Sequence, residues 1–262
     1  MKLCAPKPAR TQSPKTLWVI MKKSKFYLIC LSVILFSCNT GYENDGEKVY
    51  YNYWNEGSGS HKVELDANPE TFKILDHDRY AKDDKNVWFD GEIVKDADAE
   101  TFESIHEWYG RDKNSGFRTG AMVQGSQGKS FELIDKNYYS TDGIDVFYDT
   151  LPLKVCSAKN FVILTEEDGP WKWTTDGCFY YYMSWKIPSA DYKNVTYFEG
   201  SNGLAKDLKY VYFGDHLLNY NDEGERIIDT IDAASFTVSG LLDCKDKWGC
   251  INIYWGREDC EK

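Results

Sequence analysis

Among the 262 residues of this chain, the cysteines give the clearest indication of chemical function. Cys38 follows a small residue, Ser37, at the end of an apolar run from Phe26 to Phe36. Lysines precede this run, which is too short to span a bilayer comfortably. A basic region, a short apolar core and a small residue before cysteine are typical of a lipoprotein signal peptide. We therefore expect the sulfur of Cys38 to carry a diacylglycerol and to hold the protein at a membrane surface.

This lipidation site divides the chain. Residues 1–20 contain no motif and precede Met21, which is the expected translation start. They are therefore interpreted as an extension that results from an incorrectly assigned start codon. Residues 21–37 are the predicted signal peptide, residues 38–48 a short polar tether, and residues 49–262 a single folded domain. An uncleaved anchor helix or an ordinary secretory signal is the alternative, and the Ser-Cys ending argues against both. The expected location is the bacterial cell envelope, with the outer membrane as the expected membrane, although the residues after Cys38 give no firm sorting signal.

The cysteines beyond Cys38 are expected to form disulfides. An odd number remains, so one of them is unpaired or intermolecular. The candidate pairs are Cys156 with Cys178, and Cys244 with Cys250, which would close the last hairpin; Cys260 is the other cysteine. The spacings lack paired C-x-x-C knuckles, and an oxidising compartment favours disulfides over a metal site.

The sequence contains no recognisable catalytic constellation. Its histidines form no H-E-x-x-H motif, and neither a G-x-S-x-G elbow nor a phosphate loop is present. His77 and His106 stand beside acidic residues, and Asn219 to Glu223 resembles the start of a calcium loop, but an exposed turn is the favoured interpretation of each. We therefore predict no catalytic residue, no metal and no cofactor, and a protein that is not an enzyme.

Tryptophan offers the best candidate for a contact surface. Trp171 and Trp173 bracket Lys172 after a Gly-Pro pair, so the two rings are expected to share one face. Exposed aromatic rings stack on sugars or pack against proteins, which makes a glycan or a protein the expected partner. Nucleic acid is excluded as a partner because the net charge is −11, whereas phosphate binding needs gathered Lys and Arg.

A repeat of about 30 residues organises the folded region. Its anchors are Phe72, Phe102, Phe131 and Phe161, with Phe236 as a late copy and Val195 in place of one Phe. Each repeat also has a polar turn that begins with Asp and runs into a β-branched and aromatic stretch. The repeated Asp is interpreted as a turn former whose carboxylate accepts hydrogen bonds from backbone amides just ahead. These residues are Asp84, Asp142, Asp176, Asp207 and Asp246.

The chain resembles the DKNYY family, whose motif is intact here as Asp135, Lys136, Asn137, Tyr138 and Tyr139. Tyr80 to Phe89 fits the same pattern, whereas Phe117 to Val123 departs from it, and the resemblance extends over residues 45–258. The resemblance implies a bacterial, often exported protein with a repeat architecture, and it implies no catalytic residue.

The expected fold is all-β. Short aromatic runs bounded by Gly, Asp or Asn are the signature of strands and hairpins, and one unit of this size cannot bury its own apolar face. We predict tandem β-hairpin repeats in an elongated or curved antiparallel array, with a propeller-like closed ring as the alternative. The predicted function is a membrane-anchored, non-enzymatic binding or structural module of the cell envelope, and the alternative is an envelope carbohydrate hydrolase.

Overall fold

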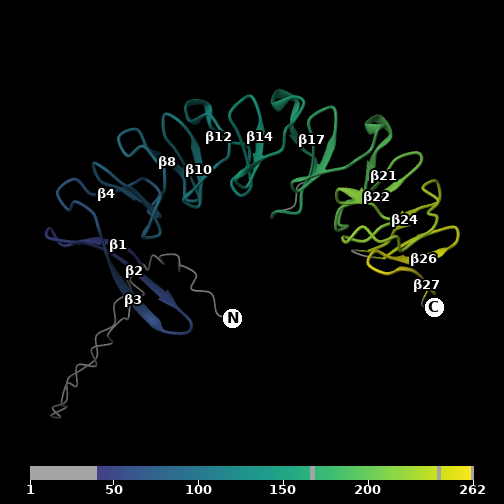
Figure 1. Ribbon diagram of the computed structural model, residues 1–262, viewed down its shortest axis with the longest axis horizontal. Helices are drawn as coiled ribbons and strands as arrows, with labels where there is room; N and C mark the ends of the chain where they lie inside the picture. The colour runs from purple at the N-terminus through teal and green to yellow at the C-terminus, as the bar shows by residue number, and fades with distance from the viewer. Residues whose placement is uncertain (1–39, 166–168, 241–242, 261–262) are drawn as a thin grey trace, which may run out of the picture. The chain divides into compact units, whose positions relative to one another are not determined.

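The computed structural model describes residues 40–165, 169–240 and 243–260, and within these residues every regular element is a β-strand or a short 3₁₀ helix. The strands form seven small antiparallel sheets that follow one another in tandem along the chain and do not close into a ring (Figure 1). The predicted all-β tandem array is therefore confirmed, and the propeller-like ring is not formed. Among the described residues, no helix has the length and apolarity that crossing a bilayer would require.

The first sheet has three strands, and the other six are four-stranded meanders rather than two-stranded hairpins. We call the four strands of a meander a, b, c and d in chain order. The first sheet comprises β1 (Gly41–Asn44), β2 (Val49–Asn55) and β3 (Gly59–Leu65). The second comprises β4 (Lys73–Ile74), β5 (Tyr80–Lys82), β6 (Val87–Phe89) and β7 (Glu92–Ile93), and the third β8 (Glu103–His106), β9 (Tyr109–Arg111), β10 (Gly116–Arg118) and β11 (Ala121–Met122).

The four remaining sheets repeat this order. The fourth comprises β12 (Glu132–Leu133), β13 (Tyr139–Thr141), β14 (Val146–Tyr148) and β15 (Leu151–Pro152), and the fifth β16 (Val162–Ile163), β17 (Trp173–Thr175), β18 (Tyr180–Tyr182) and β19 (Trp185–Lys186). The sixth comprises β20 (Thr196–Tyr197), β21 (Leu204–Lys206), β22 (Val211–Phe213) and β23 (His216–Leu217), and the seventh β24 (Thr237–Val238), β25 (Cys244–Asp246), β26 (Gly249–Asn252) and β27 (Gly256–Glu258). The 3₁₀ helices η1 (Gly128–Ser130), η2 (Ala158–Asn160) and η3 (Tyr192–Asn194) precede the fourth, fifth and sixth sheets.

The anchor residues occupy one structural position. Each lies directly before strand a of its sheet, including Val195 before β20. Phe102, Phe131 and Phe236 are buried. The Phe102 ring packs between successive sheets, against Tyr80 of the second and Phe117 of the third. The period seen in the sequence thus corresponds to one four-stranded sheet per repeat.

The first sheet extends further toward the N-terminus than predicted. The segment assigned to a tether, 38–48, contributes β1, which pairs with β2 along its whole length. The side chain of Asp45 closes the hairpin between them, because it accepts hydrogen bonds from the backbone N–H groups of Glu47 and Lys48. The described fold therefore already includes residue 41. The predicted start extension, the signal peptide and Cys38 lie outside the described residues.

One Asp carboxylate recurs at the b–c turn of every four-stranded sheet, and we call it the turn Asp. In the fifth sheet Asp176 Oδ1 accepts hydrogen bonds from the backbone N–H groups of Cys178 and Phe179, at 2.8 and 2.7 Å. Its Oδ2 accepts a third, from Cys156 N–H at 2.8 Å, in the connection that leads into the same sheet. The turn Asp therefore shapes the turn and also ties it to that connection. The six turn Asp residues are Asp83, Asp112, Asp142, Asp176, Asp207 and Asp246.

One detail of the predicted turn pattern is wrong. In the second sheet the turn Asp is Asp83, which is buried, and not its neighbour Asp84, which lies exposed and accepts a hydrogen bond from the Thr71 hydroxyl. The Asp135–Tyr139 motif also occupies a different place from Asp84–Phe89, because it precedes strand b (β13) whereas Asp84–Phe89 leads into strand c (β6). Sequence similarity between the two segments hides this difference of position.

Tyrosine hydroxyl groups join successive sheets. The Tyr42 hydroxyl donates to the carbonyl of Arg79 (3.0 Å) and accepts from Gly91 N–H (3.1 Å). The Tyr80 hydroxyl repeats this arrangement one sheet later, with the carbonyl of Trp108 (3.2 Å) and Gly120 N–H (3.3 Å). Each hydroxyl thus satisfies backbone groups of the following sheet at the centre of the contact between sheets.

Replacing Tyr80 with Phe is expected to lower the free energy of unfolding by about 1 kcal/mol, because the partly buried Gly120 N–H loses its acceptor. Urea denaturation monitored by tryptophan fluorescence measures this change. Tyr53→Phe is the matched control, since Tyr53 is 37% exposed and removing its hydroxyl should leave stability unchanged. Equal stability of the two variants would contradict the role of the hydroxyl between the sheets.

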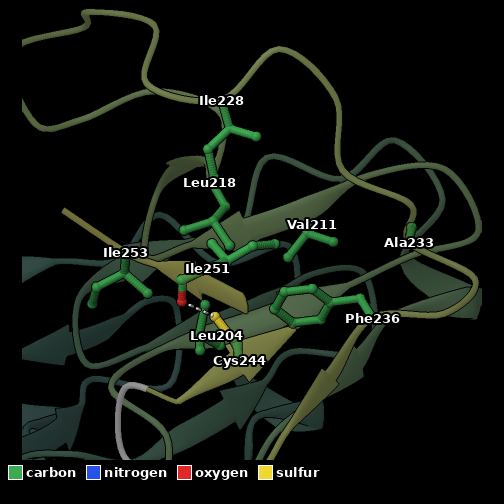
Figure 2. Packing of buried hydrophobic residues seen from close by; sticks show 9 residues of the cluster. All are labelled: Leu204, Val211, Leu218, Ile228, Ala233, Phe236, Cys244, Ile251 and Ile253. Atoms are coloured by element: carbon green, nitrogen blue, oxygen red, sulfur yellow. Dashed lines mark hydrogen bonds between the residues drawn. The ribbon is translucent and has the colours of Figure 1, made fainter. Parts of the chain in front are cut away.

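The core of the last two sheets contains a cysteine. Figure 2 shows Cys244 packed among Leu204, Val211 and Ile251, with its Sγ donating to the carbonyl of Ile251 at 3.3 Å. Cys244 is 4% exposed, and burial raises the pKa of its thiol to about 12. The side chain thus behaves as an apolar core residue with an unreactive thiol.

The disulfides follow from this arrangement. One joins Cys156 to Cys178, the pair that lies within one repeat. The other joins Cys250 to Cys260 and not to Cys244, so the predicted pairing of Cys244 with Cys250 is wrong. Successive strand residues point to opposite faces of a sheet, and Cys244 pairs in register with Ile251 rather than with Cys250. Cys244 therefore faces the core while Cys250 faces away from it.

Candidate functional site

The meander topology places two kinds of turn at one end of every four-stranded sheet. The a–b and c–d connections lie at this end, and the b–c turn with its turn Asp lies at the other, because successive strands run in opposite directions. The turn Asp end is alike in all six sheets. The other end differs from sheet to sheet, and a candidate site is formed there by the last three sheets.

We call this site the aromatic cleft. It has a volume of ≈ 610 Å³ and lies between the fifth, sixth and seventh sheets. Trp171 comes from the a–b connection of the fifth sheet, Trp185 from β19, and Tyr254 from the turn between β26 and β27. The cleft is lined by Trp171, Tyr182, Met183, Trp185, Asn202, Phe213, Gly214, Asp215, His216, Asp222 and Tyr254.

Two of the aromatic rings of the cleft, Trp185 and Tyr254, are held in place by their neighbours, and they and Trp171 remain accessible. Trp171 is 47% exposed, Trp185 41% and Tyr254 46%. The Trp185 ring lies against Gly214, where an added Cβ would come within 2.8 Å of the ring. Tyr254 meets Phe213 edge to face, with ring centroids 6.4 Å apart. Large rings that are both positioned and open to solvent are suited to stacking on a ligand.

Polar groups stand beside these rings. The His216 ring lies between two carboxylates, with Nδ1 at 3.4 Å from Asp215 and Nε2 at 3.8 Å from Asp222. Phe213 meets the same imidazole edge to face at 5.7 Å between centroids. Asn202 adds an amide that can both donate and accept hydrogen bonds. The cleft therefore combines stacking surfaces with groups that fix the orientation of a ligand.

The structure separates the two tryptophans that were predicted to share a face. Trp171 lines the cleft, whereas Trp173 is only 1% exposed and packs in the core against Tyr182 and Tyr197. Trp173 also borders a small cavity of ≈ 50 Å³, which shares Trp171, Tyr182 and Asn202 with the cleft. Its buried indole N–H has no acceptor among the described residues. Trp171 is thus the accessible ring of the pair, and Trp173 lies in the core behind it.

The other candidates do not gather into a second site. His77 and His106 come together from neighbouring sheets, with ring centroids 5.7 Å apart, and burial lowers the pKa of His106. The described residues contain one cluster with metal-ligand geometry, Cys156, Asp176 and Cys178. Both of its sulfurs are joined in the disulfide and so offer no thiolate. The remaining disulfide candidates, Cys244 and Cys250, lie away from the cleft's lining.

The possible calcium loop is a hydrogen-bonded turn. Asn221 Oδ1 accepts a hydrogen bond from Glu225 N–H at 2.8 Å, and Tyr220 pairs with Arg226 across the turn. The side-chain oxygen of Asn221 is thus used within the turn. One residue of this segment, Asp222, instead belongs to the aromatic cleft.

Several residues of the cleft were missed in the sequence, namely Trp185, Phe213, Asp215, His216 and Tyr254. They occupy strand c, the c–d turn or strand d of different repeats, where the second sheet has Phe89, Asp90, Gly91 and Glu92. A strand-by-strand alignment of the repeats could have identified some of them, because Trp185 and His216 both stand at the first position of strand d.

In a comparison with protein families, residues 21–121 match the DKNYY family. No curated protein and no solved structure matches the chain. The matched range contains the first and second sheets and the third as far as Ala121 in β11, whereas the Asp135–Tyr139 motif and the aromatic cleft lie beyond it. The chain therefore carries a DKNYY family domain over residues 21–121.

Proposed function

We propose that this protein is a non-enzymatic, glycan-binding lipoprotein of the bacterial cell envelope, anchored through an acylated Cys38. The observation that carries the proposal is the aromatic cleft, where Trp171, Trp185 and Tyr254 expose their rings beside Asn202 and a histidine flanked by carboxylates. Pyranose rings present an apolar face to an aromatic ring and hydroxyl groups to polar side chains. The cleft provides both kinds of partner within one hollow.

The anchor is proposed from the sequence. A basic region, an apolar run and Ser37 before Cys38 support acylation of that cysteine. The first strand begins at Gly41, so only a few residues would separate the lipid from the folded sheets. A lipidated protein of this kind would hold its first sheet close to the membrane, with the cleft of the last three sheets available to the glycans of the envelope.

Binding is preferred to hydrolysis because of the environment of the carboxylates. A glycosidase acid works in an apolar or crowded setting that keeps its proton on at neutral pH. The side chains of Asp215 and Asp222 are 64% and 75% exposed, which is the setting of solvated carboxylates. An envelope carbohydrate hydrolase is therefore the alternative that the binding experiment also tests, through the appearance of new reducing ends.

Replacing Trp185 with Ala is expected to weaken binding to tetrasaccharides by about tenfold or more, because a positioned aromatic ring contributes much of the contact energy. The measurement is titration calorimetry of the purified full chain with tetramers of N-acetylglucosamine, of glucosamine and of glucose. Trp54→Ala is the matched control, since Trp54 is 53% exposed in the first sheet. The control should bind like the unmodified protein.

The proposal fails if no tetrasaccharide binds, or if Trp54→Ala and Trp185→Ala weaken binding equally. Release of reducing ends during the titration would establish the hydrolase instead. Capture of a protein from envelope extracts, lost in Trp185→Ala, would show that the cleft takes a protein.

A further inference from the structure

The aromatic cleft carries two carboxylates without a lysine or arginine beside them. Its lining contains Asp215 and Asp222, and it contains no lysine or arginine. In the part of the chain that the structure describes, the ion pairs of these two carboxylates are with His216 alone. The same hollow offers the faces of tryptophan and tyrosine rings, which attract cations through their quadrupole.

In the second sheet, a similar combination of aromatic rings and a carboxylate binds an arginine side chain. Arg79, directly before strand b, forms an ion pair with Asp90 at the c–d turn. Its guanidinium carbon lies 4.5 Å from the ring centroid of Phe89 and 3.7 Å from that of Trp108. A cation is therefore held at this end of the sheet between aromatic rings and a carboxylate of the c–d turn.

A second example joins the third and fourth sheets. Arg118 pairs with Asp149, again at a c–d turn. Its guanidinium carbon lies 4.9 Å from the ring centroid of Tyr138 and 5.6 Å from that of Tyr109. The arrangement is thus a recurring property of the contacts between sheets and does not belong to one repeat.

The sixth sheet has an aromatic ring and a carboxylate like those of the second sheet, but it has no corresponding arginine. Phe213 occupies the position of Phe89, and Asp215 lies in the c–d turn. Gly203 stands before strand b, where the second sheet has Arg79. A side chain at Gly203 would collide with the Tyr182 ring, since an added Cβ would lie 2.6 Å from it. The chain therefore supplies no arginine or lysine of its own at this place, and the imidazole of His216 is the basic group beside the carboxylates.

The geometry points to a positively charged amino sugar as the ligand of the aromatic cleft, with its ammonium group beside Asp215 and Asp222 and its ring against the tryptophans. This inference rests on the proposed function, because it specifies which glycan the cleft takes. Free amino groups on glucosamine units carry the charge, whereas N-acetylation removes it. The two forms of the same sugar thus separate the contribution of charge from that of stacking.

The test compares tetramers of β-1,4-linked glucosamine and N-acetylglucosamine by titration calorimetry with the full chain. The glucosamine tetramer is expected to bind about tenfold more tightly, since an ammonium group gains from both the carboxylates and the rings. The combined variant Asp215→Asn, Asp222→Asn should reduce this preference to about threefold or less, because the two charges that attract the ammonium are gone. Asp229→Asn is the control, since Asp229 is 97% exposed and outside the cleft, and it should keep the full preference.

Each outcome has a distinct meaning. Equal binding of the two tetramers by the unmodified protein would overturn the amino-sugar inference and leave glycan binding intact. A preference that survives in the combined variant would overturn it as well, since the named carboxylates would not be its source. Spermidine that binds as tightly as the glucosamine tetramer, with no effect of Trp185→Ala, would show attraction of any polycation and would also overturn it. Absence of binding to either tetramer and to the glucose tetramer would instead remove the proposed function.

Discussion

Replacing Asp176 with Asn is expected to lower the free energy of unfolding by about 3 kcal/mol, because buried donors lose a charged acceptor. The Asp176 carboxylate accepts hydrogen bonds from three backbone N–H groups and from the Tyr181 hydroxyl. The residue is 0% exposed, so water cannot replace these contacts without opening the turn. Urea denaturation of the full chain measures the change.

The pH dependence of this effect gives an independent check. Burial acts to raise the pKa of Asp176, but the hydrogen bonds outweigh it, and the pKa lies below its ordinary value. A carboxyl group whose pKa is depressed by folding stabilises the protein above its unfolded pKa of about 4 and loses that contribution as the pH falls through the folded pKa. The difference between the unmodified protein and Asp176→Asn should therefore shrink as the pH falls below about 4.

The control for Asp176 is Asp229→Asn, an identical change at a carboxylate that is 97% exposed. Its expected effect is within about 0.5 kcal/mol at all pH values. A loss of less than about 1 kcal/mol in Asp176→Asn would contradict the structural role of the buried turn Asp.

Removing the disulfide between Cys156 and Cys178 by a double change to Ser is expected to cost about 3 kcal/mol of unfolding free energy. The bond joins residues 22 apart, and it constrains the unfolded chain by closing this loop. The loop also contains Trp171, one of the exposed rings of the aromatic cleft. We therefore expect tetrasaccharide binding to weaken together with stability, since Trp171 becomes less well positioned.

The second disulfide supplies the comparison. Cys250 and Cys260 are 10 residues apart, so their replacement by Ser should cost somewhat less, about 2.5 kcal/mol. Tyr254 lies in this shorter loop, and binding again reports on the position of its ring. Retention of full stability after removal of the Cys156–Cys178 disulfide, measured by urea denaturation, would contradict the pairing or its contribution.

Much of the repeat was readable in the sequence because it depends on local geometry. In every repeat that forms the four-stranded sheet, an anchor residue must precede strand a and a turn former must precede strand c. Val195 was recognised as a substitute for Phe by its neighbours, and it lies before β20 as the pattern predicts. Phe117 looked irregular because Gly116 stands where Val87 stands in the second sheet. The Phe131 ring fills the space there, within 2.4 Å of where a Cβ would lie.

Errors arose where two neighbouring residues of the same type have different environments. Asp83 and Asp84 are indistinguishable as turn formers in sequence, and the structure identifies Asp83 as the buried one through the hydrogen bonds it accepts from Asn68 N–H and Asn86 N–H. Trp171 and Trp173 alternate along the chain, but the first lies in a connection and the second in β17, so the strand periodicity that would align their rings does not apply.

The sequence by itself determined the β-rich repeat, its period and the use of Asp at its turns, because these depend on short-range spacing that recurs along the chain. Tertiary structure alone decided which residues meet. It brings Trp171 and Trp185 of the fifth sheet together with Tyr254 of the seventh, and it places Cys244 in the core while Cys250 bonds to Cys260. The physical reason is that these contacts depend on how successive sheets stack and on which face of its sheet each side chain points to. The spacing of residues within one repeat specifies neither.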